Sequence, residues 1–134
     1  MPIVIDASVA IDWFVTAPSE DAEIALDAVA ADGAVVPALW RWEVQDVLRR
    51  LDLAGRLAKS IDFIRAELRE LPISVDGELT GLFGAEAALA SRYSLTVYDA
   101  AYLELALRLD IPLATTDKGL LAAAKTARIR RPRR

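Results

Sequence analysis

The stretch Ile3-Val4-Ile5-Asp6-Ala7-Ser8 decides the fold. Its three consecutive β-branched residues form a short apolar run, which is typical of a strand buried on both faces in a parallel sheet. The run ends at an acid followed by small residues, which predicts that a helix begins there. Asp6 is therefore expected at the carboxyl end of a buried strand, where ligands bind in sheets of this kind.

Strand-like and helical segments alternate along the rest of the chain. Further short strands are predicted at Val35–Pro37, Ile73–Val75 and Ile111–Thr116, with a weak edge strand around Ile129. Helical spacing of apolar residues predicts helices in the intervening segments, including 39–53, 61–71, 79–90, 99–109 and 118–125. This alternation predicts an α/β domain of three layers, in which helices flank a central, mainly parallel sheet of four or five short strands.

Composition limits the chemistry that this chain can perform. Its 134 residues, 54% hydrophobic and 27% charged, predict one globular domain. The chain has no Cys and no His, which excludes disulfides, a Cys/His zinc site, a Ser-His-Asp triad and an imidazole base. Carboxylates and hydroxyls remain, and these suit magnesium or manganese. The absence of cysteine and the lack of a basic region at the N-terminus predict a cytoplasmic protein without a membrane anchor.

The C-terminal end differs in charge from the rest of the chain. Five of the 16 basic residues lie at 128–134, which contains no acid, whereas the whole chain has a net charge of −4. We expect a domain over residues 1–127 followed by a basic tail over 128–134. Such a tail is either a solvated end or a segment that attracts a phosphate backbone.

Four acids, Asp6, Glu43, Asp99 and Asp117, are predicted at strand ends or near helix starts. Any one of them is explained by helix capping or by solvation, and for Asp99 capping and cation binding both remain open. Because strand ends meet at one edge of a parallel sheet, the four carboxylates are expected to converge. A cluster of this kind is repulsive unless a cation neutralises it, which favours a divalent metal.

The order of motifs in this chain resembles that of PIN-domain proteins, most closely the VapC-type toxin ribonucleases of bacterial toxin–antitoxin modules. The matching segments are Val4-Ile5-Asp6-Ala7-Ser8, Pro37-Ala38-Leu39-Trp40 with Glu43-Val44, Thr96-Val97-Tyr98-Asp99-Ala100-Ala101-Tyr102-Leu103 and Ala114-Thr115-Thr116-Asp117. The resemblance implies a Mg²⁺- or Mn²⁺-dependent endoribonuclease that acts on RNA, forms a homodimer and is inhibited by a VapB-like antitoxin. It also implies that Asp6, Glu43, Asp99 and Asp117 hold the metal and carry catalysis.

Several further residues have two interpretations. Asp46 stands where many relatives carry Asn, and it either joins the metal ligands or faces solvent. Ser8 and Thr116 either position ligands or cap helices. Trp13, Trp40 and Trp42 are suited to stacking on bases, but core packing is the favoured interpretation.

Two other classes of protein are considered. Aspartyl-phosphate enzymes also place an Asp after their first strand, but the phosphatases use Asp-x-Asp, whereas this chain has Asp6-Ala7-Ser8. Response-regulator receivers pair adjacent acids before the first helix, and these are missing here. The remaining alternative is a non-catalytic PIN-like module whose acidic cleft receives a basic partner segment.

Overall fold

The computed structural model describes residues 1–77 and 83–134 of the chain, whose centre is a parallel sheet. Its four strands are β1 (Ile3–Ile5), β2 (Ala34–Pro37), β3 (Ile73–Asp76) and β4 (Leu113–Ala114), in the order β3-β2-β1-β4. All neighbouring strands are parallel, and Val4 of β1 pairs with both Val35 and Leu113. The predicted α/β class and parallel sheet are confirmed.

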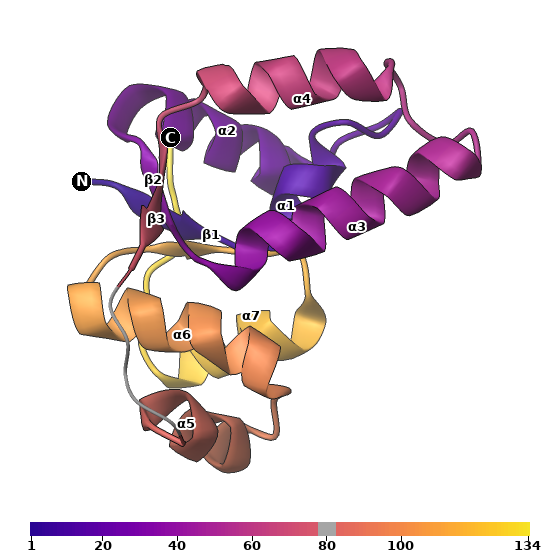
Figure 1. Ribbon diagram of the computed structural model, residues 1–134. Helices are drawn as coiled ribbons and strands as arrows, with labels where there is room; N and C mark the ends of the chain where they lie inside the picture. Colours follow the sequence, from indigo (N-terminus) through magenta and orange to yellow (C-terminus); the bar gives the residue numbers. More distant parts are fainter. Residues whose placement is uncertain (78–82) are drawn as a thin grey trace.

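Helices cover both faces of the sheet and form the outer layers (Figure 1). One layer holds α1 (Ala7–Asp12), α2 (Glu20–Asp32), α3 (Leu39–Leu53) and α4 (Ile61–Glu70). The other layer holds α5 (Ala85–Tyr93), α6 (Val97–Leu109) and α7 (Lys118–Thr126). None of the described helices is long and apolar enough to cross a membrane.

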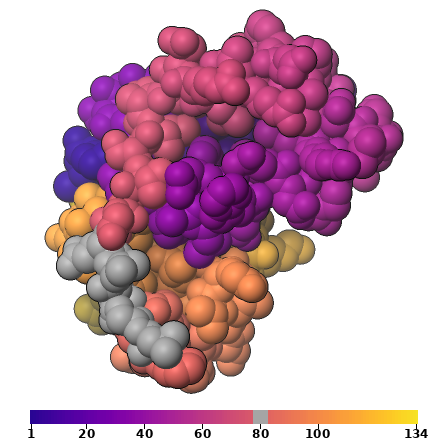
Figure 2. Space-filling model, viewed as in Figure 1, coloured from indigo at the N-terminus to yellow at the C-terminus, as the bar shows by residue number. Residues whose placement is uncertain are grey.

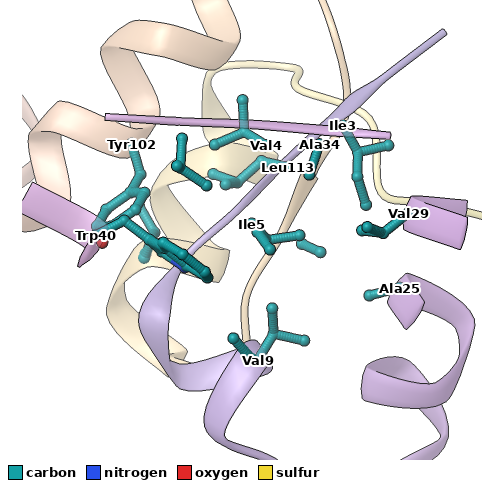
Figure 3. Packing of buried hydrophobic residues seen from close by; sticks show 14 of the residues in the cluster. Ile3, Val4, Ile5, Val9, Ala25, Val29, Ala34, Trp40, Tyr102 and Leu113 are labelled. Carbon is teal, nitrogen blue, oxygen red and sulfur yellow. The ribbon is translucent and has the colours of Figure 1, made fainter. Parts of the chain in front are cut away.

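The hydrophobic core surrounds β1, as the opening apolar run predicts. Val4 and Ile5 are fully buried, and Figure 3 shows them in one cluster with Val9, Val29 and Leu113. Burial of each such aliphatic side chain is worth about 1.5–3 kcal/mol. Because both faces of β1 are covered, its carboxyl end is held rigidly, and with it the backbone of Asp6.

Two helices begin at positions other than those predicted. Helix α6 begins at Val97 rather than at Asp99, because the Thr96 side chain caps it. Helix α5 begins at Ala85, because Phe83 has a positive φ of 58° and lies outside the helix. Leu79 and Leu82, which were also expected in this helix, lie outside the described residues.

Strand β4 is shorter than expected, and the tail lies against it. The strand covers only Leu113–Ala114, and Pro112, which has no N–H to donate, precedes its start. No strand forms around Ile129 in the described part of the chain. A single backbone hydrogen bond of 3.0 Å from Leu113 N to the Arg130 carbonyl takes its place. The segment through Arg131 is therefore docked on the domain and is not a free end.

Candidate active site

All four predicted acids line one cavity of about 410 Å³ at the carboxyl end of the sheet. Asp6 follows β1, Glu43 lies on α3, Asp99 lies on α6, and Asp117 caps α7. The cavity wall is completed by Ala7, Ser8, Ile11, Val47 and Tyr102. Four segments distant in sequence thus bring their carboxylates to one place.

Asp6 is the most buried of these acids, with 4% of its surface exposed. Its Oδ1 accepts hydrogen bonds from the Ser8 hydroxyl at 2.7 Å and from Val9 N at 3.0 Å, and its Oδ2 accepts one from the Thr115 hydroxyl. Burial raises the pKa of Asp6, and the charge of Asp99 adds to this, while the three hydrogen bonds oppose the shift. The geometry therefore fixes the carboxylate but leaves its charge poorly compensated.

Thr115 is a site residue that sequence reasoning missed, since the hydroxyl of Thr116 was considered instead. Thr115 is 5% exposed, donates to Asp6, and accepts a hydrogen bond of 3.0 Å from Asp117 N. Thr116 is exposed, and its backbone N–H donates to Ser8 Oγ at 3.1 Å. The alternation of side chains along extended backbone could have indicated that Thr115 is buried, because it lies two residues after the apolar Leu113 and faces the same side.

Asp99 is not the cap of its helix, which excludes one of the two interpretations of its local role. The Thr96 hydroxyl accepts a hydrogen bond of 3.0 Å from Asp99 N and so performs the capping. The Asp99 carboxylate lines the cavity in the first turn of α6. Its pKa is raised by burial and then by the charge of Asp117, while the Thr96 side chain opposes the shift.

Among the described residues, one hydrogen-bond donor holds the carboxylate of Glu43 and one holds that of Asp117. The Tyr102 hydroxyl donates to Glu43 Oε1 at 2.5 Å, and Leu120 N donates to Asp117 Oδ2 at 2.8 Å. Tyr102 is 1% exposed. Burial, followed by the bond to Glu43 and the charges of nearby acids, raises the Tyr102 pKa well above its usual range. Its hydroxyl therefore stays protonated and acts as a donor.

The donor set of the cavity fits a hard divalent cation. Four carboxylates and the Ser8 hydroxyl are oxygen ligands of the kind that magnesium and manganese prefer, and no Lys or Arg is among the described residues that line the cavity. Within residues 1–77 and 83–134, no three acids are already arranged to hold an ion. A cation held by one or two of these carboxylates completes its ligands with water, as magnesium commonly does in proteins.

Asp46, Trp40 and Trp13 do not line the cavity and make other contacts. Asp46 is exposed and pairs with Arg50 at 3.2 Å, so it faces solvent and does not line the cavity. Trp40 is buried, and its Nε1 donates to the Asp6 carbonyl at 3.3 Å. Trp13 packs on the core and donates to the Ala22 carbonyl at 2.8 Å.

Trp42 differs from the other two tryptophans. It is 64% exposed, so the favoured interpretation of core packing is wrong for this residue. The guanidinium carbon of Arg41 lies 5.5 Å from the centre of its ring, in a cation–π contact.

Comparisons with known proteins agree with the motifs and the fold. The PIN domain family model matches residues 3–126. The chain is 35% identical over 127 residues to Ribonuclease VapC3 of Mycobacterium tuberculosis, from strains CDC 1551 / Oshkosh and ATCC 25618 / H37Rv, covering 93% of this chain and 89% of each relative. The crystal structure of PAE2754 from Pyrobaculum aerophilum matches with a TM-score of 0.68 and 20% sequence identity, over 92% of this chain and 84% of that one. This last likeness concerns the fold alone.

Proposed function

The chain belongs to the PIN-domain family, among its VapC-type members, and we propose that it is a metal-dependent endoribonuclease, the toxin of a VapBC-type toxin–antitoxin module. The observation that carries this proposal is the cavity lined by Asp6, Glu43, Asp99 and Asp117, where the described lining residues include no Lys or Arg. The family membership and the identity to Ribonuclease VapC3 support RNA as the substrate.

The residues of the cavity have distinct tasks in this proposal. Asp6 and Asp99 are the first-choice ligands of one or two Mg²⁺ or Mn²⁺ ions, because burial raises the pKa of both and a neighbouring acid, Asp99 for Asp6 and Asp117 for Asp99, raises it further. Glu43 and Asp117 complete the ligands or orient the attacking water. The bound cation supplies Lewis-acid polarisation of the phosphodiester and acidifies water.

Hydrolysis then needs no protein nucleophile. The water oxygen would bond to phosphorus as the bond from phosphorus to the 3′ oxygen breaks. The water gives up one proton and the 3′ oxygen takes one up, so the products are the 3′-hydroxyl and 5′-phosphate that the family resemblance implies. Preorganisation is this chain's own contribution, because hydrogen bonds from Thr115, Ser8 and Val9 hold Asp6 before substrate arrives. Like charges in the cavity repel a phosphate backbone, so the cation is also required for the substrate to approach.

We propose a VapB-like antitoxin as the partner of this toxin, and a homodimer as its assembly. A basic antitoxin segment that enters the acidic cavity competes with both cation and RNA.

A second, largely apolar groove of about 400 Å³ lies between α3 and α4, where Figure 2 shows the surface hollowed. Its lining contains Arg41, Arg65 and Arg69 and no described acid, which suits an amphipathic partner segment that carries acids.

The experiment that tests this function compares Asp99→Asn with Asp46→Asn in purified protein free of antitoxin. Asp99→Asn abolishes magnesium-dependent RNA cleavage and leaves the circular dichroism unchanged, because it removes a cavity carboxylate without changing side-chain volume. Asp46→Asn is the matched control, since Asp46 pairs with Arg50 outside the cavity. Full activity of Asp99→Asn contradicts the site assignment. Absence of cleavage by wild type with either metal favours the non-catalytic module.

A cellular experiment identifies the target. The 5′ ends of RNA are mapped after brief induction of wild type and of Asp6→Ala. Discrete new 5′ ends that appear only with wild type establish both the activity and the cleavage site. Identical maps for the two proteins contradict the proposed activity of this cavity.

A further inference from the structure

Tyr102 joins the hydrophobic core to the candidate active site. Its side chain is 1% exposed and belongs to the buried cluster in Figure 3. The same residue lines the acidic cavity, three positions after Asp99 on α6. Core packing therefore fixes the ring, and the phenolic oxygen occupies a defined place in the cavity wall.

The Tyr102 hydroxyl contacts Glu43 across the cavity. The hydrogen bond of 2.5 Å to Glu43 Oε1 links α6 to α3, and the two residues are 59 positions apart in sequence. A glutamate side chain has several freely rotating bonds and loses conformational entropy when it is held in one orientation. The rigid tyrosine supplies this orientation before any ligand binds.

Glu43 differs in this respect from two other acids of the cavity. Val9 N donates to Asp6, and Leu120 N donates to Asp117, so each of these carboxylates is held by the backbone of the helix that it caps. The donor to Glu43 is a side chain on a different helix. The orientation of Glu43 therefore depends on one phenolic hydroxyl, which a single substitution can remove.

We propose that Tyr102 is a positioning residue for Glu43: its hydroxyl engages one carboxylate oxygen and leaves the other for ligands in the cavity. The inference rests on the proposed function for the identity of those ligands, a divalent cation and the attacking water. Tyr102 contacts neither of them in this assignment and acts through Glu43.

Tyr102→Phe tests the proposal, because it removes the hydroxyl and keeps the buried ring. We expect kcat for RNA cleavage and the affinity for Mn²⁺, measured by titration calorimetry, to fall ~10- to 100-fold, as is usual when a partner of a metal ligand is lost. KM for RNA stays nearly unchanged. The double variant Tyr102→Phe/Glu43→Gln is no worse than Glu43→Gln alone, because the tyrosine acts only through the glutamate.

Two further variants keep the test decisive. Tyr93→Phe on α5 makes the same chemical change away from the cavity and leaves Mn²⁺ affinity and kcat unchanged. Glu43→Asp keeps the charge but shortens the side chain, so it loses the contact with Tyr102 and leaves Tyr102 itself unchanged. This variant can be measured even if Tyr102→Phe fails to fold. We expect Glu43→Asp to lose activity and Mn²⁺ affinity by a similar factor.

The outcomes separate this proposal from the proposed function. Wild-type kcat and Mn²⁺ affinity in Tyr102→Phe, or losses that add to those of Glu43→Gln, overturn the positioning role and leave the nuclease intact. If wild type cleaves no RNA, the proposed function fails, and Mn²⁺ affinity alone decides. In that case, weaker Mn²⁺ binding by Tyr102→Phe than by wild type supports the positioning role. Equal Mn²⁺ binding by the two proteins, or no Mn²⁺ binding by wild type, overturns it.

Discussion

Thr115, directly after β4, donates a hydrogen bond through its side-chain hydroxyl to Asp6 Oδ2, directly after β1. Both residues are almost fully buried, and Thr115 also accepts the N–H of Asp117. One hydroxyl thus connects two of the cavity acids. A Thr115→Val substitution leaves both partners without this contact, and we expect it to lower the free energy of unfolding by about 1–3 kcal/mol. Urea denaturation measures this change.

Thr115→Ser is the matched control for that prediction. It retains the hydroxyl and loses only a methyl group, so most of the wild-type stability remains. The Thr115 bond lowers the pKa of Asp6, so its loss in Thr115→Val raises that pKa further and moves the acid limb of the pH–rate profile to higher pH. Equal stability of Thr115→Val and wild type contradicts this account of Asp6.

The first strand and its acid could be predicted from the sequence, whereas several contacts of the site could not. The apolar run before Asp6 determines a buried strand by itself, because the pattern is local. Thr96 and Asp99 are both good capping residues, and only the actual helix start shows that Thr96 caps and Asp99 is free to face the cavity. The bond between Tyr102 and Glu43 spans 59 residues and depends on how two helices pack, which no local pattern encodes.

Asp99→Asn is expected to stabilise the protein at neutral pH in the absence of metal. The pKa of Asp99 is raised in the folded state, so folding favours the protonated carboxyl over the charged one. The stability that the protonated form contributes is complete below the unfolded pKa and is lost as pH rises through the folded pKa. At about pH 7.5 the variant gains up to ~1 kcal/mol, because it removes the cost of burying the charge and then the repulsion with Asp117, in a partly solvated site. As pH falls to about 3.9, the ordinary aspartate pKa, the gain shrinks, because the folded-state pKa is raised and the wild-type carboxyl is protonated first in the folded protein.

Urea denaturation at the two pH values checks this prediction, with Asp46→Asn as control. Asp46 makes an exposed pair with Arg50, so its substitution changes stability little at either pH. A variant Asp99→Asn that is less stable than wild type near neutral pH contradicts the view that the Asp99 charge is uncompensated.

Mn²⁺ and Mg²⁺ are expected to raise the melting temperature of wild type, because an ion that binds the folded state alone stabilises it. At a metal concentration of about 100 Kd the stabilisation is ~2.7 kcal/mol. Differential scanning fluorimetry measures the shift, which is small in Asp6→Ala and unchanged in Asp46→Asn. Equal shifts in wild type and Asp6→Ala place the ion outside the cavity and contradict the proposed ligand set.

The docked C-terminal segment gives a prediction about stability. Removal of residues 128–134 deletes the Arg130 carbonyl that accepts the Leu113 N–H, the Ile129 side chain packed on the core, and the 2.6 Å ion pair between Arg131 and Asp21. We expect a loss of about 1–2 kcal/mol in the free energy of unfolding, to which the exposed ion pair contributes least.

Two matched variants separate the parts of this segment. Removal of residues 133–134 takes away two arginines beyond the contacts described and leaves stability unchanged. Arg131→Ala removes the ion pair with Asp21 but keeps the backbone bond to Leu113, so it costs less than about 1 kcal/mol. If urea denaturation shows that Arg131→Ala costs as much as the full truncation, the ion pair holds the segment and the backbone bond to β4 does not. If the full truncation is as stable as wild type, the segment contributes nothing to β4, the strand that Thr115 directly follows.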